Sequence, residues 1–197
     1  TALCVDLLNQ SGSKRNIPKI SIQQYREKFL FPIKTFYESV GFNFDNESFE
    51  DTNQEFHDSF AKQFKTLALQ PFAKETIIKI SKTNTMQSIL SATMQGKLTE
   101  QVGFFDLQHY LENIVGLSST PSGYGKEYEG SELMMGVDIP ESETIIIGDS
   151  VLDFSVSQSL GIDCALVYNG HNDMNRLKAT GSYTFEHIDS FYNWLTD

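Results

Sequence analysis

The chain has 197 residues, 40% of them hydrophobic and 21% charged, and a formal net charge of −11 at pH 7. This length allows one sizeable core, or a core with a small accessory domain. The excess of acidic side chains argues against nucleic acid as a partner. Two cysteines are too few for a disulfide scaffold, and no apolar stretch is long enough to span a bilayer. We therefore expect a soluble, cytoplasmic protein, a monomer or homodimer with no membrane partner.

Residues 1–70 show a helical pattern without a long strand. The sequence Ser21–Gln24 resembles a capping box, Ser48 or Asp51 is placed to begin a later helix, and Ser11–Ser13 predicts a break in the first one. We expect a small helical bundle. Large apolar side chains recur in it at helical spacing, and we interpret them as core packing: Phe29, Phe31, Ile33, Phe36, Tyr37, Val40, Phe49, Phe56, Phe60 and Phe64.

After Pro71 short apolar runs alternate with helical segments. Strands that alternate with helices of about ten residues indicate a parallel sheet with right-handed crossovers. The sequence therefore predicts an α/β core over residues 71–197. The predicted strands are Met86–Leu90, Ile114–Gly116, Thr144–Ile147, Cys164–Tyr168 and Ser182–Phe185, and the predicted helices include Phe72–Lys82, Gln95–Val102 and Tyr124–Met135.

Two carboxylates follow the most apolar of these strands, at Asp149 and Asp153. An apolar run without alternation is typical of a strand buried on both faces, and open α/β sheets place their ligands at the carboxyl ends of such strands. A pair of carboxylates there suits a hard cation such as Mg²⁺. The alternative is that Asp149 or Ser150 caps the helix that begins near Val151.

Further polar groups fall at the ends of other strands or at helix starts, in Ser91–Thr93 and at Lys126. Parallel strands end at the same edge of the sheet, so we expect these groups to converge with Asp149. A hydroxyl with helix-start amides can bind phosphate oxygens, and a lysine can neutralise charge on a phosphoryl group in transfer.

The order Leu90–Thr93, Lys126, then Ile147–Asp153 resembles motifs two, three and four of the haloacid dehalogenase superfamily. The helical first section is similar to that family's helical C1 cap, as in phosphoglycolate-phosphatase-like members. The resemblance implies a Rossmann-like parallel-sheet core, residues 71–197, with an all-helical cap, residues 1–70.

The resemblance also implies a role for each matching residue. Ser91 and the backbone of Ala92 would bind the phosphoryl group, and Lys126 would stabilise that group and the nucleophile. Asp149 would ligate Mg²⁺, and Asp153 would position Asp149 or Lys126 without touching the metal itself. Two positions depart from the family pattern: Ala92 replaces a frequent Asn, and Glu127 replaces a frequent Pro.

The family's first motif, Asp-x-Asp-x-Thr, which supplies the nucleophile, is not present in the sequence. Asp6 is no substitute, because it lies within a helical pattern. In related folds the strand that carries this motif lies between the strands that correspond to Met86–Leu90 and Ile145–Ile147. We therefore expect roughly fifteen to twenty residues before Thr1, the length of a buried strand with its loop.

The function implied by the resemblance is that of a Mg²⁺-dependent phosphatase acting on a small phosphorylated metabolite through an aspartyl-phosphate intermediate. A phosphomutase is an alternative because it uses the same core motifs. A catalytically inactive binding protein is another, since the first motif is missing. A dehalogenase is the weaker alternative, because such members lack a metal.

Overall fold

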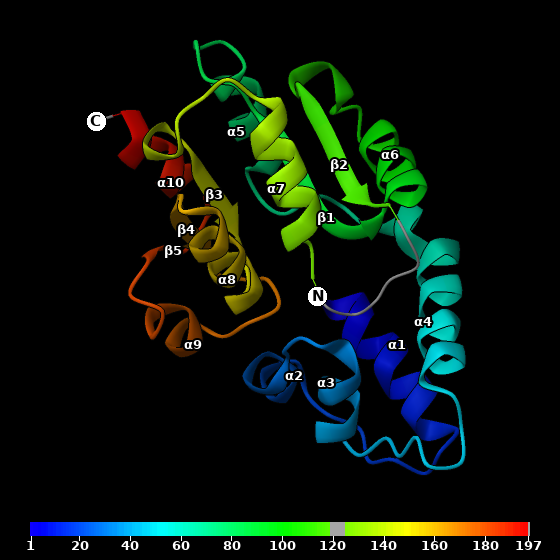
Figure 1. Ribbon diagram of the computed structural model, residues 1–197. Helices are drawn as coiled ribbons and strands as arrows, with labels where there is room; N and C mark the ends of the chain where they lie inside the picture. Colours follow the sequence, from blue (N-terminus) through cyan, green and yellow to red (C-terminus); the bar gives the residue numbers. More distant parts are fainter. Residues whose placement is uncertain (119–124, 197) are drawn as a thin grey trace.

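The computed structural model describes residues 1–118 and 125–196, and Figure 1 shows the helices of the first section gathered at one end of the molecule. The predicted capping box at Ser21 is confirmed, with Gln24 as its partner, and Ser48 caps the longest helix. The helices are α1 (Ala2–Ser13), α2 (Ile22–Lys28), α3 (Ile33–Ser39) and α4 (Phe49–Gln63), followed by the short η1 (Phe64–Thr66).

The break predicted at Ser11–Ser13 comes slightly later, because α1 includes these residues and ends at Ser13. Ser11 and Gly12 are buried, the carbonyl and hydroxyl of Ser11 accept hydrogen bonds from Arg15, and Gly12 packs against Ile17. Tertiary packing therefore overrides the weak helix propensity of glycine and serine.

Most of the apolar stripe of the first section does form a core. Tyr25, Phe29, Phe36 and Tyr37 are all nearly inaccessible to solvent, and their rings pack edge to face or stacked. Burial of such rings is the main stabilising contribution in this section. The complete buried cluster is Val5, Leu8, Tyr25, Phe29, Phe36, Tyr37, Val40 and Phe42.

The second section alternates strands with helices, as predicted. The predicted start of the third helix at Tyr124 lies outside the described residues. The boundary predicted between residues 70 and 71 falls between η1 and α5, and the division into two domains stays a prediction. The elements are α5 (Ala73–Ile80), β1 (Ser88–Met94), α6 (Gln95–Phe104), η2 (Gln108–Tyr110), β2 (Asn113–Leu117), α7 (Glu127–Gly136), η3 (Glu141–Glu143), β3 (Ile145–Gly148), α8 (Val151–Leu160), β4 (Asp163–Val167), α9 (Met174–Lys178), β5 (Tyr183–Phe185) and α10 (Ile188–Thr196).

All strand pairs among the described residues are parallel, and they form two sheets, β1–β2 and β3–β4–β5. The first strand differs from its predicted range, Met86–Leu90, because it begins at Ser88 and continues to Met94. Its pairing register shifts between Leu90 and Met94, where Met94 pairs with Leu117. Ser91–Thr93 therefore lies inside the irregular end of β1 and not after it.

The edges of β1 and β3 that border the cavity described below are not joined by a strand of the described chain. The run Ile145–Ile147, expected to be buried on both faces, is only half-buried. In β4, by contrast, Cys164, Ala165 and Leu166 are buried. The expectation that a strand lies between β1 and β3 stays a prediction. No helix within the described ranges is long and apolar enough to cross a membrane.

Candidate active site

A cavity of about 740 Å³ opens between the helical first section and the carboxyl ends of β1 and β3. All five residues that the sequence singles out line it: Ser91, Ala92, Lys126, Asp149 and Asp153. They come from the end of β1, the start of α7, the loop after β3 and the first turn of α8. The convergence expected from parallel topology is therefore present.

Lys126 and Asp153 form an ion pair at the floor of this cavity. Lys126 Nζ lies 2.8 Å from Asp153 Oδ1, and the two side chains are only 10% and 7% exposed. The same ammonium donates a hydrogen bond of 2.8 Å to the carbonyl of Leu90. The lysine thus links the end of β1 to the start of α8.

The second carboxylate oxygen of Asp153 accepts three hydrogen bonds, from the backbone N–H of Asp149 (3.1 Å), the backbone N–H of Ser150 (3.0 Å) and the Ser150 hydroxyl (2.7 Å). Burial opposes ionisation of this carboxyl. The charge of Lys126 and these hydrogen bonds outweigh it, so the pKa of Asp153 is lowered. Asp153 is therefore a fully bonded anion that fixes the loop carrying Asp149.

Asp149 holds a different position from Asp153. Its Oδ2 accepts a hydrogen bond of 2.7 Å from the backbone N–H of His171, and its Oδ1 bonds to none of the described residues. Gly170 packs so closely against the carboxylate that a Cβ at that position would overlap it. Ser150, and not Asp149, is the N-cap residue of α8. Asp149 instead presents to the cavity the carboxylate oxygen that bonds to none of the described residues.

Ser91 lies half-buried at the irregular end of β1 and faces the same cavity. Its hydroxyl oxygen accepts the backbone N–H of Thr93 at 3.2 Å, so its proton is available to a ligand. Leu90, the residue before it, is bonded to Lys126. Ser91 and Lys126 are thereby held on one side of the cavity.

Sequence reasoning missed the loop after β4, residues 169–173, as part of the site. His171 lines the cavity, stacks on Phe29 with ring centroids 4.4 Å apart, and its Nδ1 lies 2.8 Å from the Tyr25 hydroxyl. Burial lowers the pKa of His171 although the nearby Asp149 charge opposes this. The signal that could have identified the loop is its position at the carboxyl end of a predicted parallel strand.

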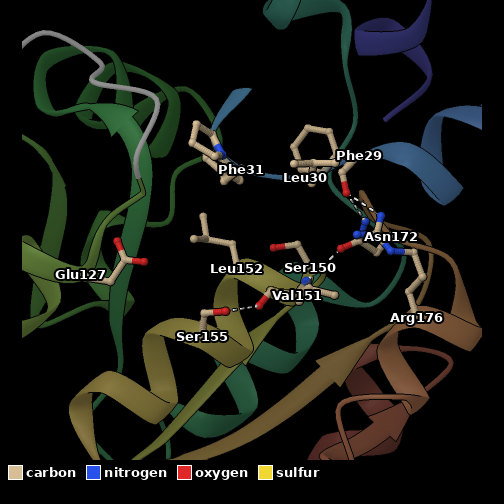
Figure 2. Close-up of a pocket in the computed structure, with 11 residues that line it drawn as sticks. Phe29, Leu30, Phe31, Glu127, Ser150, Val151, Leu152, Ser155, Asn172 and Arg176 are labelled. Carbon is tan, nitrogen blue, oxygen red and sulfur yellow. Dashed lines mark hydrogen bonds between the residues drawn. The ribbon is translucent and has the colours of Figure 1, made fainter. Parts of the chain in front are cut away.

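Asn172 connects this loop to the helical section (Figure 2). Its side-chain oxygen accepts the N–H of Val151 at 2.8 Å, and its amide donates to the carbonyl of Phe29 at 2.9 Å. Arg176 donates to the same Phe29 carbonyl. Arg26 bonds in return to the carbonyls of Asn169 and Gly170. The contacts of Asn172 and Arg176 border a second, smaller cavity of about 230 Å³ beside α8.

Fold and site together define an enzyme with a parallel-sheet α/β core and a helical section over the carboxyl ends of its strands. A family model described as haloacid dehalogenase-like hydrolase matches residues 1–167. The chain belongs to this family, as its motifs indicate. Comparison with curated proteins found no match.

Several solved structures share the fold. A predicted phosphatase from Clostridium acetobutylicum superposes with a TM-score of 0.81 at 18% identity, over 99% of this chain and 91% of that one. A predicted phosphoglycolate phosphatase from Haemophilus somnus gives 0.73 at 14%, over 98% and 90%. A Thermotoga maritima protein described as a beta-phosphoglucomutase gives 0.69 at 16%, over 99% and 91%. At these identities the likeness shows the fold alone.

Proposed function

We propose that the protein is a Mg²⁺-dependent phosphatase that hydrolyses a small phosphorylated metabolite through an aspartyl-phosphate intermediate. The observation that carries this proposal is the convergence of Ser91, Lys126 and Asp149 on one cavity. Family membership supports a hydrolase in general, and the phosphate chemistry follows from these three side chains.

Lys126 has the geometry of a phosphoryl-binding group. An ammonium carries three N–H donors, and those of Lys126 that are committed go to Asp153 and the Leu90 carbonyl. A remaining donor can point to a phosphoryl oxygen from a position fixed by the other bonds. The free proton of the Ser91 hydroxyl and the backbone N–H of Ala92 supply further donors, so Lys126 need not act alone.

Asp149 is the residue that would hold Mg²⁺, because it offers a free carboxylate oxygen while Asp153 is fully bonded. Within the described ranges no three ligating side chains lie close enough to form a metal cluster. Mg²⁺ is commonly held by one or two carboxylates, waters and the substrate phosphate. When bound, the cation would neutralise charge on the phosphoryl group.

We assign no nucleophile among the described residues. Asp6 lies on an exposed face of α1 and does not line the cavity, as expected from its sequence context. The aspartyl-phosphate step is therefore proposed from the family resemblance.

Release of inorganic phosphate by the full-length protein tests the proposal. A panel of phosphomonoesters is incubated with Mg²⁺ or with a chelator. The proposed phosphatase releases phosphate only with Mg²⁺. A phosphomutase, the activity for which the Thermotoga maritima structure is named, converts one ester to its isomer without net release. A protein that binds esters but changes none of them is the inactive alternative, and this outcome contradicts the proposal.

A further inference from the structure

One face of α4 forms the wall of the cavity opposite the strands. Asn53, Phe56, His57 and Phe60 lie on this face at helical spacing and line the cavity. The Phe56 and Phe60 rings are stacked, with centroids 6.2 Å apart and planes at 24°. Both rings are half-buried and stand outside the buried cluster of the first section. A ligand that covers them removes apolar surface from water.

The wall formed by the helical section carries no lysine or arginine among its described residues, and Asp58 is its charged member. The neighbouring His57 is accessible to solvent, yet surrounding protein desolvates it and lowers its pKa, despite the charge of Asp58. The lowered pKa disfavours the imidazolium form of His57.

The lysines that line the cavity come from the α/β core, Lys97 on α6 and Lys126 at the start of α7. Lys126 is committed to Asp153 and the phosphoryl group, and Lys97 of α6 lies 4.0 Å from Glu100. A second anionic group of a substrate, placed against α4, would meet aromatic rings and a carboxylate. Burying a charge without a partner is strongly unfavourable, so this wall selects against such substrates.

We propose that the leaving alcohol of the substrate is uncharged and carries an aromatic ring that packs on Phe56 and Phe60, whereas esters with a second anion, such as phosphoglycolate, are poor substrates. This inference rests on the proposed phosphatase function and names its substrate class. On this inference the protein does not act on phosphoglycolate, the substrate for which the Haemophilus somnus structure is named, although the two proteins share a fold.

Binding of two non-hydrolysable phosphonates to the full-length protein with Mg²⁺ tests the inference by calorimetry. Phenylphosphonate carries a ring, and phosphonoacetate carries a carboxylate in its place. We expect phenylphosphonate to bind at least about tenfold more tightly, since 1.4 kcal/mol is within the range for one matched apolar group. Phe60→Leu should weaken its binding about two- to tenfold through the lost ring contact.

Phe49→Leu is the matched control, because it is the same substitution on the same helix. Phe49 packs against Tyr37 and Phe44, with centroids 6.1 Å and 5.5 Å away, and does not line the cavity. This variant should leave both affinities unchanged. Asn53→Lys should tighten phosphonoacetate binding by adding a cation to the wall.

Equal or tighter binding of phosphonoacetate by the unmodified protein overturns the inference, as does an equal loss of phenylphosphonate binding in Phe49→Leu and Phe60→Leu. Failure of both phosphonates to bind also overturns it. If the protein prefers phenylphosphonate but hydrolyses no phosphomonoester, the inference about the aromatic wall stands and the proposed phosphatase function is wrong. The two failures are therefore distinguishable.

Discussion

The ammonium of Lys126 and the carboxylate of Asp153 form a buried ion pair, with Nζ 2.8 Å from Oδ1. Lys126 also bonds to the carbonyl of Leu90 in β1, and Asp153 fixes the backbone at Asp149 and Ser150 after β3. The pair therefore joins two sheets that share no ladder hydrogen bonds among the described strands. Its integrity should matter for both stability and catalysis.

The first prediction concerns the stability of this pair. Asp153→Asn leaves a buried lysine without its counter-charge, which typically costs about 3–5 kcal/mol of unfolding free energy. Lys126→Met should also destabilise the protein. The double variant should lose less than the sum of the two, because neither unpaired charge remains. Urea unfolding of the unmodified protein, the two single variants and the double variant measures these losses, and additive losses would contradict the prediction.

The acid dependence of the same pair gives a control. The pKa of Asp153 is lowered in the folded state, so its contribution is present above the unfolded pKa, about 3.9, and is lost as the pH falls through the folded value. The difference in stability between the unmodified protein and Asp153→Asn should therefore shrink below about pH 4.

The second prediction concerns turnover at Lys126. If its free N–H stabilises charge that develops on the phosphoryl group, Lys126→Ala should lower kcat by about 10²–10³-fold and change KM less. Lys126→Arg should rescue only partly, because a planar guanidinium cannot replace a compact ammonium. Steady-state kinetics on folded material, checked by circular dichroism, measures both. Unchanged kinetics in Lys126→Ala would place the phosphoryl-binding lysine elsewhere.

The sequence was sufficient to predict the fold class and the convergence of the site. Strand–helix alternation indicates a parallel sheet, and parallel topology brings the end of β1 and the loop after β3 to one edge. The capping signals at Ser21 and Ser48 were sufficient to predict where two helices begin, because such signals act over only three residues. These features depend on short-range pattern and on topology.

The contacts between the helical section and the loop after β4 were beyond sequence reasoning. Asn172 bonds to the carbonyl of Phe29, 143 positions away, and no periodicity encodes such a pair. The division of the apolar stripe is another case, because Val40 lies in the buried cluster and away from the cavity, while Phe56 and Phe60 lie outside that cluster and line the cavity. Both depend on which surfaces meet after folding.

The third prediction tests the metal assignment. Asp149→Asn keeps the size of the side chain and an oxygen that can accept the N–H of His171, but removes the charge that a divalent cation requires. We expect Mg²⁺ binding and Mg²⁺-dependent turnover to be abolished while the fold is retained. Calorimetric Mg²⁺ titration and phosphate release measure these. Asp6→Asn, on the exposed face of α1, is the matched control and should behave as the unmodified protein; normal turnover in Asp149→Asn would show that the metal assignment is wrong.

The fourth prediction concerns the attachment of the helical section. The side chain of Asn172 is only 1% exposed and bridges Val151 and the Phe29 carbonyl. Asn172→Asp removes the donor and sets a carboxylate against a carbonyl, at a cost of about 1–3 kcal/mol. Hydrogen exchange should accelerate in residues 22–40, and KM should rise as the cavity loses one wall. Asn175→Asp, exposed on α9, should change neither; equal exchange in the two variants would mean that Asn172 does not hold the sections together.

The last prediction uses the close approach of Gly170 to Asp149. A methyl group at Gly170 would overlap the Asp149 carboxylate, and that carboxylate is already bonded to the N–H of His171. Gly170→Ala should therefore displace the carboxylate and weaken Mg²⁺ binding in a protein that still folds. Gly103→Ala is the control, because a Cβ there would point into open space. In a helix that change should raise stability by about 0.5–1 kcal/mol and leave Mg²⁺ affinity alone. Calorimetric titration with Mg²⁺ and urea unfolding distinguish the two effects. If Gly170→Ala binds Mg²⁺ normally while Asp149→Asn does not, the loop after β4 yields without moving the carboxylate, and the backbone of residues 169–172 is less rigid than its hydrogen bonds indicate.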